Sequence, residues 1–146
     1  PLGGVSVYLF TPSGGYLGKS QVTDAAGRAV FNLPDQPYKV RADYLGLQFW
    51  SATFRSQNTT VEINRGAAQV HVTRAGDDVS GANVYLFGSG GSYLGQLKVT
   101  DTEGIARFVL PIASFKFRVD FGGVQRWSGM IDITTGQENP LDIGMD

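Results

Sequence analysis

An internal repeat constrains the fold of this chain more than any other feature of its sequence. The segment VYLF at residues 7–10 recurs at residues 84–87, and VTD at residues 22–24 recurs at residues 99–101. Both pairs are 77 positions apart, and the same offset continues without a gap as far as Trp50 and Trp127. Such self-similarity indicates a duplicated folding unit. We therefore predict two domains, residues 1–66 and residues 67–146.

Each repeat is predicted to consist of β-strands. No window has a helical period, whereas short runs rich in β-branched and aromatic residues alternate with glycine-containing turns. In the first repeat we expect strands at residues 5–10, 18–23, 28–33, 38–44, 48–54 and 60–63. Short strands with turns at this spacing favour an all-β fold, with two tandem antiparallel Ig-like β-sandwich domains.

The second repeat has an opening strand with no counterpart in the first. Residues 69–73 alternate valine with polar residues, and the 77-residue offset places the equivalent strand before residue 1. Two explanations remain open. The sequence is a slice of a longer repeat array, or another segment supplies the strand.

Charge and composition exclude several classes of function. Twelve Lys and Arg against thirteen Asp and Glu give a net charge of -1, which argues against nucleic acid as a partner. There is no cysteine and one histidine, so we expect no catalytic residues, no metal site and no cofactor. No apolar run approaches the roughly 18 residues of a membrane helix, so we expect no membrane insertion.

Alternation along the strands predicts which side chains face the core. Ala29, Phe31 and Leu33 are expected on one face. Phe49 of the first repeat is replaced by Arg126 in the second, which indicates that this position faces water. The neighbouring Trp50 and Trp127 are therefore predicted to lie in the core.

The candidate functional residues are aromatic and basic side chains expected outside the core. Alternation against Val7 and Leu9 turns the candidate aromatic side chains away from the core, and the candidate arginines lie on the outward side of a later strand. They are Tyr8, Phe10, Tyr85, Phe87, Arg41 and Arg118. Outward aromatic residues need a cover. They either lie under the loops at Tyr16 and Tyr93, pack against a neighbouring domain, or bind carbohydrate or protein.

The remaining polar residues singled out by the sequence are predicted to be structural. Asp24 and Asp101 precede tight turns, where a carboxylate accepts backbone N–H bonds. His71 has no copy in the first repeat and is predicted to be a surface residue. Arg41 with Asp43, and Arg118 with Asp120, are predicted to lie on a solvated face with cross-strand ion pairs or to contact a neighbouring unit.

The repeats resemble the transthyretin-like group of Ig-type sandwiches. The pattern consists of an apolar strand, Thr-Asp-x-x-Gly, an alternating strand and Leu-Pro before an aromatic strand, and it covers nearly the whole of each repeat. This group includes carboxypeptidase regulatory-like repeats and the B-type repeats of bacterial collagen adhesins. The adhesin repeats often carry a Lys-to-Asn isopeptide bond with lysine on the opening strand. Residues 69–74 contain no lysine, so we predict no such crosslink.

The resemblance implies a fold and leaves three functional hypotheses open. The first is a non-catalytic stalk or spacer in a larger cell-surface or secreted protein, whose partners are neighbouring repeats of the same chain. The second is an adhesion module that binds polysaccharide or a surface protein. The third is an accessory domain of a larger extracellular enzyme.

Overall fold

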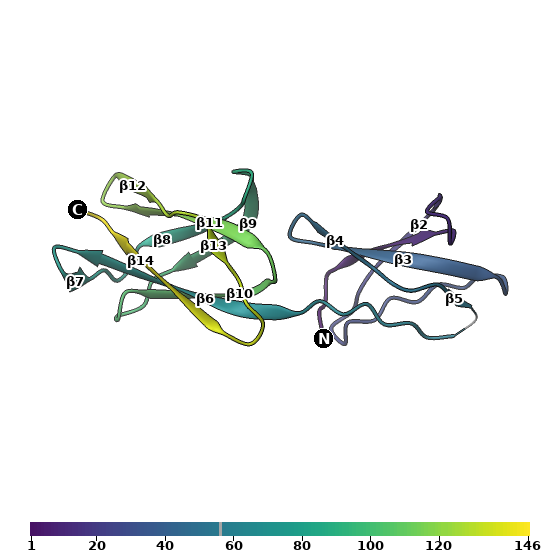
Figure 1. Cartoon of the computed structure of the whole chain (residues 1–146). Helices are drawn as coiled ribbons and strands as arrows, with labels where there is room; N and C mark the ends of the chain where they lie inside the picture. Colours follow the sequence, from purple (N-terminus) through teal and green to yellow (C-terminus); the bar gives the residue numbers. More distant parts are fainter. Residues whose placement is uncertain (56) are drawn as a thin grey trace. The chain divides into compact units, whose positions relative to one another are not determined.

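The computed structural model describes residues 1–55 and 57–146 and divides them into two compact units, Pro1–Glu62 and Ile63–Asp146. All regular structure in the described part of the chain is β-strand (Figure 1). The predicted all-β fold is confirmed. The described residues contain no helix with the length and apolarity needed to cross a membrane.

The first unit has one hydrogen-bonded antiparallel sheet. Its strands run in the order β2-β1-β3-β4, and the short β5 also pairs with β3. They are β1 (Ser6–Phe10), β2 (Tyr16–Val22), β3 (Pro37–Tyr44), β4 (Leu47–Trp50) and β5 (Phe54–Arg55). The inner face of this sheet carries the buried side chains of Val7, Leu9, Tyr38, Val40 and Ala42.

Two predicted strands of the first unit are wrong. Residues 28–33 and 60–63 are not strands, although Ala29, Phe31 and Leu33 do alternate with exposed neighbours as predicted. The second unit supplies the physical reason. There the counterpart of residues 28–33 is a strand because it pairs with β6, and no equivalent of β6 is present among the described residues of the first unit.

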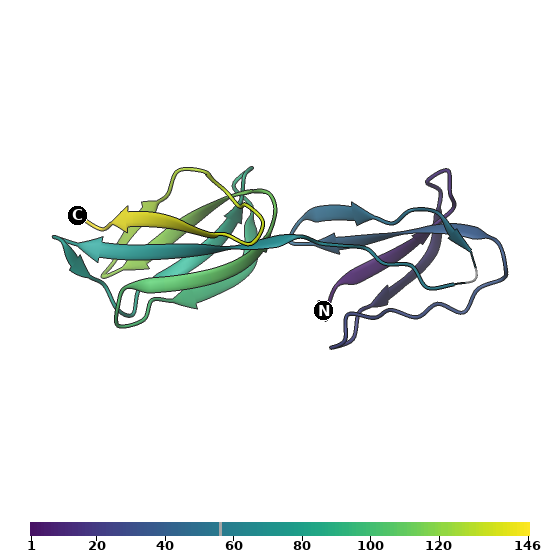
Figure 2. The same ribbon diagram turned by 60° about the horizontal axis from the view of Figure 1, so that its bottom comes forward.

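The second unit repeats the first sheet and adds another. Its first sheet runs β12-β11-β8-β9, with β13 on β11, and its second sheet runs β10-β6-β14, with β7 on β6 (Figure 2). The first consists of β8 (Asn83–Gly88), β9 (Tyr93–Val99), β11 (Ser114–Phe121), β12 (Val124–Trp127) and β13 (Ile131–Asp132). The second consists of β6 (Arg65–Arg74), β7 (Asp77–Asp78), β10 (Ile105–Pro111) and β14 (Glu138–Gly144).

The core of the second unit lies between these two sheets. The rings of Phe108 on β10 and Phe117 on β11 meet with their centroids 5.0 Å apart, and both side chains are fully buried. Val70 and Val72 on β6 and Val84 on β8 complete the same layer. Facing sheets with interdigitated apolar side chains define a sandwich.

One strand pair departs from the antiparallel arrangement. β14 runs parallel to β6, from Glu138 opposite Ala67 to Gly144 opposite Thr73. The chain therefore enters the second unit along β6 and ends it along β14, in the same direction.

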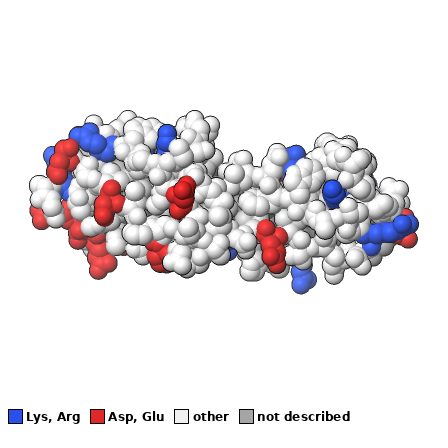
Figure 3. Space-filling view, in the orientation of Figure 1, with Lys and Arg blue, Asp and Glu red and all other residues white. Residues whose placement is uncertain are grey.

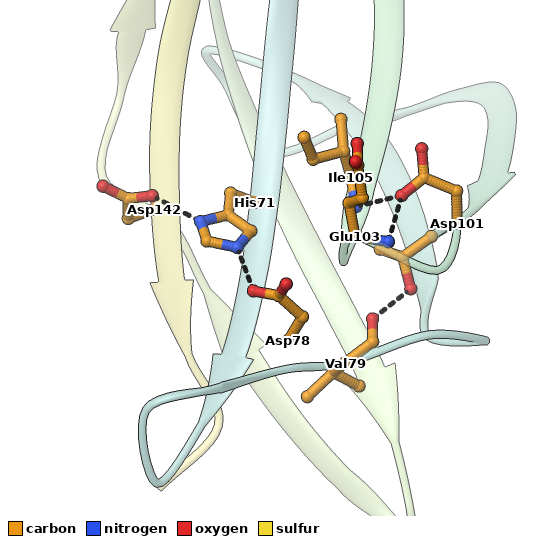
Figure 4. Close-up of polar contacts among 8 residues, drawn as sticks. His71, Asp78, Val79, Asp101, Glu103, Ile105 and Asp142 are labelled. Atoms are coloured by element: carbon orange, nitrogen blue, oxygen red, sulfur yellow. Dashed lines mark hydrogen bonds and ion pairs between the residues drawn. The ribbon is translucent and has the colours of Figure 1, made fainter.

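The turn after β9 explains why both repeats contain Thr-Asp-x-x-Gly. Thr100 Oγ1 accepts a bond from Ala82 N and donates one to Val79 O, while Asp101 Oδ1 accepts bonds from Glu103 N and Ile105 N (Figure 4). Thr23 and Asp24 form the corresponding bonds in the first unit. The predicted turn role of Asp24 and Asp101 is confirmed.

Candidate functional site

The strongest candidate site is a cluster of aromatic side chains around one arginine, present once in each unit. We call it the aromatic cluster. In the first unit it contains Tyr8, Phe10, Tyr16, Trp50 and Arg41, and in the second Tyr85, Phe87, Tyr93, Trp127 and Arg118. It lies on the outer face of the sheet, away from the core.

A β-bulge places Tyr16 in the first unit, and Tyr93 in the second, opposite the phenylalanine of the cluster. In the first unit the pairing of β1 with β2 shifts between Tyr8 and Phe10, so that Phe10 lies opposite Tyr16. Gly18 within the bulge has φ of 73°, a conformation that glycine adopts without strain. Gly95, with φ of 79°, occupies the same place in the second unit. The repeated Tyr-Leu-Gly motif is therefore the sequence signal for this cluster.

The rings of the cluster contact one another in the same way in both units. Phe10 lies 5.4 Å from Tyr16 and 4.7 Å from Trp50, measured between ring centroids. In the second unit Phe87 lies 5.5 Å from Tyr93 and 4.6 Å from Trp127. Phe10 and Phe87 are thereby buried, so for these two residues the structure shows cover by rings of their own domain, one of the three alternatives left open.

Each arginine lies over the rings and is paired with an aspartate of the same strand. Arg118 Nε and Nη2 donate to the two carboxylate oxygens of Asp120 at 2.9 and 3.1 Å. Arg41 does the same with Asp43 at 2.7 and 3.0 Å. Residues two apart on a strand share a face, so the carboxylate fixes the guanidinium over the aromatic rings. The prediction of cross-strand ion pairs is wrong, because each arginine pairs with an aspartate of its own strand, and this pairing also orients a cation–π contact.

The prediction that Trp50 and Trp127 lie in the core is wrong. Their side chains are 45% and 51% exposed. Trp50 lies opposite Arg41, whose side chain is on the outer face, and Trp127 lies opposite Arg118.

The wrong prediction for the tryptophans rested on Arg126, which replaces Phe49 in the second repeat. It occupies an inner-face position on β12, an edge strand, and its guanidinium escapes the core by reaching the backbone carbonyl of Asp146 at 3.0 Å. The residue of the repeated Trp-Ser pair that is buried in the first unit is Ser51, whose hydroxyl accepts a bond from Val40 N.

The sequence does not reveal that each cluster has an exposed edge, made of one tyrosine and the tryptophan. Tyr16 and Tyr93 are about as exposed as the tryptophans, so each cluster presents two flat rings to solvent beside a neutralised arginine. Such a surface suits stacking against a flat apolar face, such as that of a sugar ring, more than binding of an ion.

A second cluster, made of polar side chains, surrounds His71. Its Nε2 lies 2.8 Å from Asp78 on β7 and its Nδ1 lies 3.1 Å from Asp142 on β14 (Figure 4). The bond to Asp78 is the main cause that raises the pKa of His71 above 6.5, burial opposes it, and Asp142 adds to the rise. His71 is predicted to be a surface residue, and in the structure it is half-buried. Its two contacts link β6 to β7 and to β14.

The described residues show no metal site, and one face of the molecule shows no basic patch. They contain no group of three or more His, Cys, Asp or Glu side chains placed to hold a metal ion. On the face drawn in Figure 3, Lys and Arg side chains are scattered among Asp and Glu.

Comparison of the sequence with protein families and with curated proteins gives no match. Solved structures do show the same fold. The minor pilin GBS52 of Streptococcus agalactiae is 15% identical with a TM-score of 0.53, and the alignment covers 99% of this chain and 83% of the pilin. The Bacillus anthracis TIE protein is 16% identical with a TM-score of 0.51, and this chain spans 31% of its length. The chain thus shares its all-β fold with these two bacterial proteins.

Proposed function

We propose that this chain is a non-catalytic spacer in a larger bacterial cell-surface or secreted protein, and that its second unit is built to withstand tension. The observation that supports this most directly is the parallel pairing of β6 with β14. Neighbouring repeats of the same polypeptide are the proposed partners.

The geometry of this pair determines how a pulling force acts on it. β6 begins the second unit and β14 ends it, and they pair over seven residues of β14. Force on the two ends of the unit pulls parallel neighbours in opposite directions along their length. All the hydrogen bonds between them are then loaded together in shear, because the force acts along the strands and the bonds run across them.

Two side-chain contacts and one further backbone bond reinforce this pairing along the strands. Asn139 donates to the carbonyl of Ala67 at one end, and His71 contacts Asp142 further along. At the far end the N–H of Met145 donates to the carbonyl of Thr73 at 2.8 Å.

Single-molecule force spectroscopy tests the proposal. The full chain is held by its two ends and stretched at constant speed. We expect the residues of the second unit to extend in one step, at a force several-fold above that needed for the first unit. Extension of the second unit at the lower force would refute a load-bearing role.

The finer family assignment is part of the same proposal. We assign the repeats to the transthyretin-like group, near the carboxypeptidase regulatory-like and collagen-adhesin repeats. The Thr-Asp turn and the sandwich of the second unit support this assignment. The inner positions of β6 are Gly66, Ala68, Val70 and Val72, so our prediction that no lysine crosslink forms stands. An intact mass lower than the sequence mass by one ammonia would overturn it.

A second candidate function is carbohydrate binding by the aromatic clusters. It is favoured by one observation: Trp50 and Trp127 are exposed at matching positions in both units. A glycan array probed with the chain and with the Trp50→Ala/Trp127→Ala variant tests it. Binding that depends on the tryptophans would support the second candidate, and no binding to any glycan would count against it.

A further inference from the structure

The first unit contains an unfilled strand position that the second unit shows occupied. In the second unit β10 pairs with β6 from Ile105 opposite His71 to Pro111 opposite Arg65. The counterpart of β10 in the first unit, residues 28–33, has no strand paired to it among the described residues. Figure 2 draws residues 28–33 and 57–62 as plain traces and not as strand arrows.

The inward side chains next to the unfilled strand position are apolar but only partly buried. Phe31 is half-buried, whereas its counterpart Phe108 is 0% exposed. Across the core, Val7 is 8% exposed and its counterpart Val84 is 0% exposed. The apolar pattern of a sandwich is present, and the exposure that remains lies where β6 covers the second unit.

Residues 28–33 are also loosely held on their other side. A hollow of about 470 Å³ lies between β2 and this segment, lined by residues such as Lys19, Ser20 and Phe31. In the second unit β10 contacts β9 of the other sheet and pairs with β6 of its own. An extended segment without a strand in the place of β6 lacks the ladder that would fix it as a strand.

We propose that the first unit binds one further extended strand of the same polypeptide, antiparallel to residues 28–33, in the place that β6 takes in the second unit. Its sequence would follow β6, with small or aliphatic residues at alternate inward positions, as in Ala68, Val70 and Val72, and polar residues between them. This inference rests on the geometry of the repeat and is independent of the spacer function.

The entry point for such a strand is already formed. In the second unit β6 passes through a short turn and β7 to Val79, whose carbonyl accepts a 2.6 Å bond from the hydroxyl of Thr100. The carbonyl of Leu2 accepts the same bond from Thr23 at 2.6 Å. A strand joined ahead of Leu2 by the same turn would run beside residues 28–33.

The register of the proposed pairing follows from the second unit. Gly104 there accepts a backbone bond from Val72 N, and Gly27 is the equivalent acceptor in the first unit. Arg107 lies opposite Gln69, so Val30 is expected opposite the glutamine of a bound β6-like strand. Val30 is 73% exposed, as suits an outward position.

Hydrogen exchange on an extended chain tests the proposal. Residues with the sequence of positions 65–77 are added ahead of Pro1, and amide exchange is compared with that of the original chain. We expect the alternate amides of residues 28–33 that face the added strand to slow by more than about 100-fold, because they gain hydrogen-bond partners, and the amides between them to change little. The matched control carries aspartate at the positions of the extension that correspond to Ala68, Val70 and Val72. Unchanged exchange in the extended chain, or equal slowing in the control, would overturn the proposal.

A disulfide provides a second readout that does not depend on exchange rates. Val30→Cys is combined with cysteine at the glutamine of the extension, and separately with cysteine at the next residue, which points to the opposite face. We expect oxidation to close the first pair within one chain and not the second. Equal closure of both pairs, or a disulfide only between two chains, would contradict the proposed register and source of the strand.

Discussion

The guanidinium of Arg118 lies 4.6 Å from the ring centroid of Tyr85, and it is held there by the carboxylate of Asp120. The first unit repeats this arrangement with Arg41 and Tyr8 at 5.1 Å. In each unit the arginine thus covers part of an aromatic outer face, of which one tyrosine and the tryptophan stay exposed.

Removal of this arginine is expected to destabilise the second unit. Arg118→Ala loses the contacts with three aromatic rings and leaves Asp120 without its partner, which should lower the free energy of unfolding by about 1–2 kcal/mol. Arg118→Lys should fall between, because lysine lacks the bidentate geometry. Urea denaturation measures the change, with Arg74→Ala on an exposed site as the control. Equal stability of Arg118→Ala and Arg74→Ala would contradict the role given to the arginine.

The exposed position of Trp127 predicts a moderate cost for its removal. Trp127→Ala should reduce the free energy of unfolding by about 1–2 kcal/mol, whereas Phe117→Ala, at a fully buried site, should cost about 3–5 kcal/mol. Acrylamide should also quench the fluorescence of both indoles in the folded chain. Trp127→Ala as costly as Phe117→Ala, with indoles protected from acrylamide, would place the tryptophans in the core after all.

Gly66 is expected to tolerate no side chain. A Cβ at this position would lie 2.0 Å from the backbone carbonyl oxygen of Thr134, and a backbone atom has little freedom to move. Gly66→Ala should therefore destabilise the second unit by more than about 3 kcal/mol in thermal or chemical denaturation. Gly129→Ala, which meets no atom within 4 Å, is the matched control in the same unit. If the two variants are equally stable, the packing of β6 described above is incorrect.

The His71 cluster predicts that the stability of the second unit depends on pH. The hydrogen bond to Asp78 raises the pKa of His71 in the folded state above 6.5, so the protonated form stabilises the fold. This contribution is complete below pH 6.5 and is lost as the pH rises through the raised pKa. The difference in melting temperature between the chain and His71→Gln should therefore be larger at about pH 5.5 than at about pH 8.5. A constant difference, or a proton NMR titration of His71 with a midpoint below 6.5, would contradict this.

Much of the fold follows from the sequence because its signals are local. The repeat offset indicated the equivalence of the two sheets, and alternation indicated the shared face of Ala29, Phe31 and Leu33. The role of Asp101 in the turn was also predictable, because its carboxylate accepts bonds from residues only two and four positions away.

The errors arose where the outcome depends on a partner distant in sequence. Residues 28–33 have the pattern of a strand, but a strand needs a neighbour to pair with. The position of Trp50 was inferred from Arg126, and an edge strand allows an arginine on the inner side to reach solvent-exposed groups. The pairing of β14 with β6 joins residues about 70 positions apart and has no local signal.

The most direct test of the central claim is the direction dependence of the unfolding force of the second unit. Because β6 and β14 are parallel, their ends at Thr73 and Met145 lie side by side. Handles at Ile63 and Asp146 load the pair in shear, whereas handles at Gly76 and Asp146 separate its hydrogen bonds one at a time. We predict an unfolding force several-fold higher for the first pair of handles. Equal forces for the two attachments would contradict the claim that the β6–β14 pair is the load-bearing element.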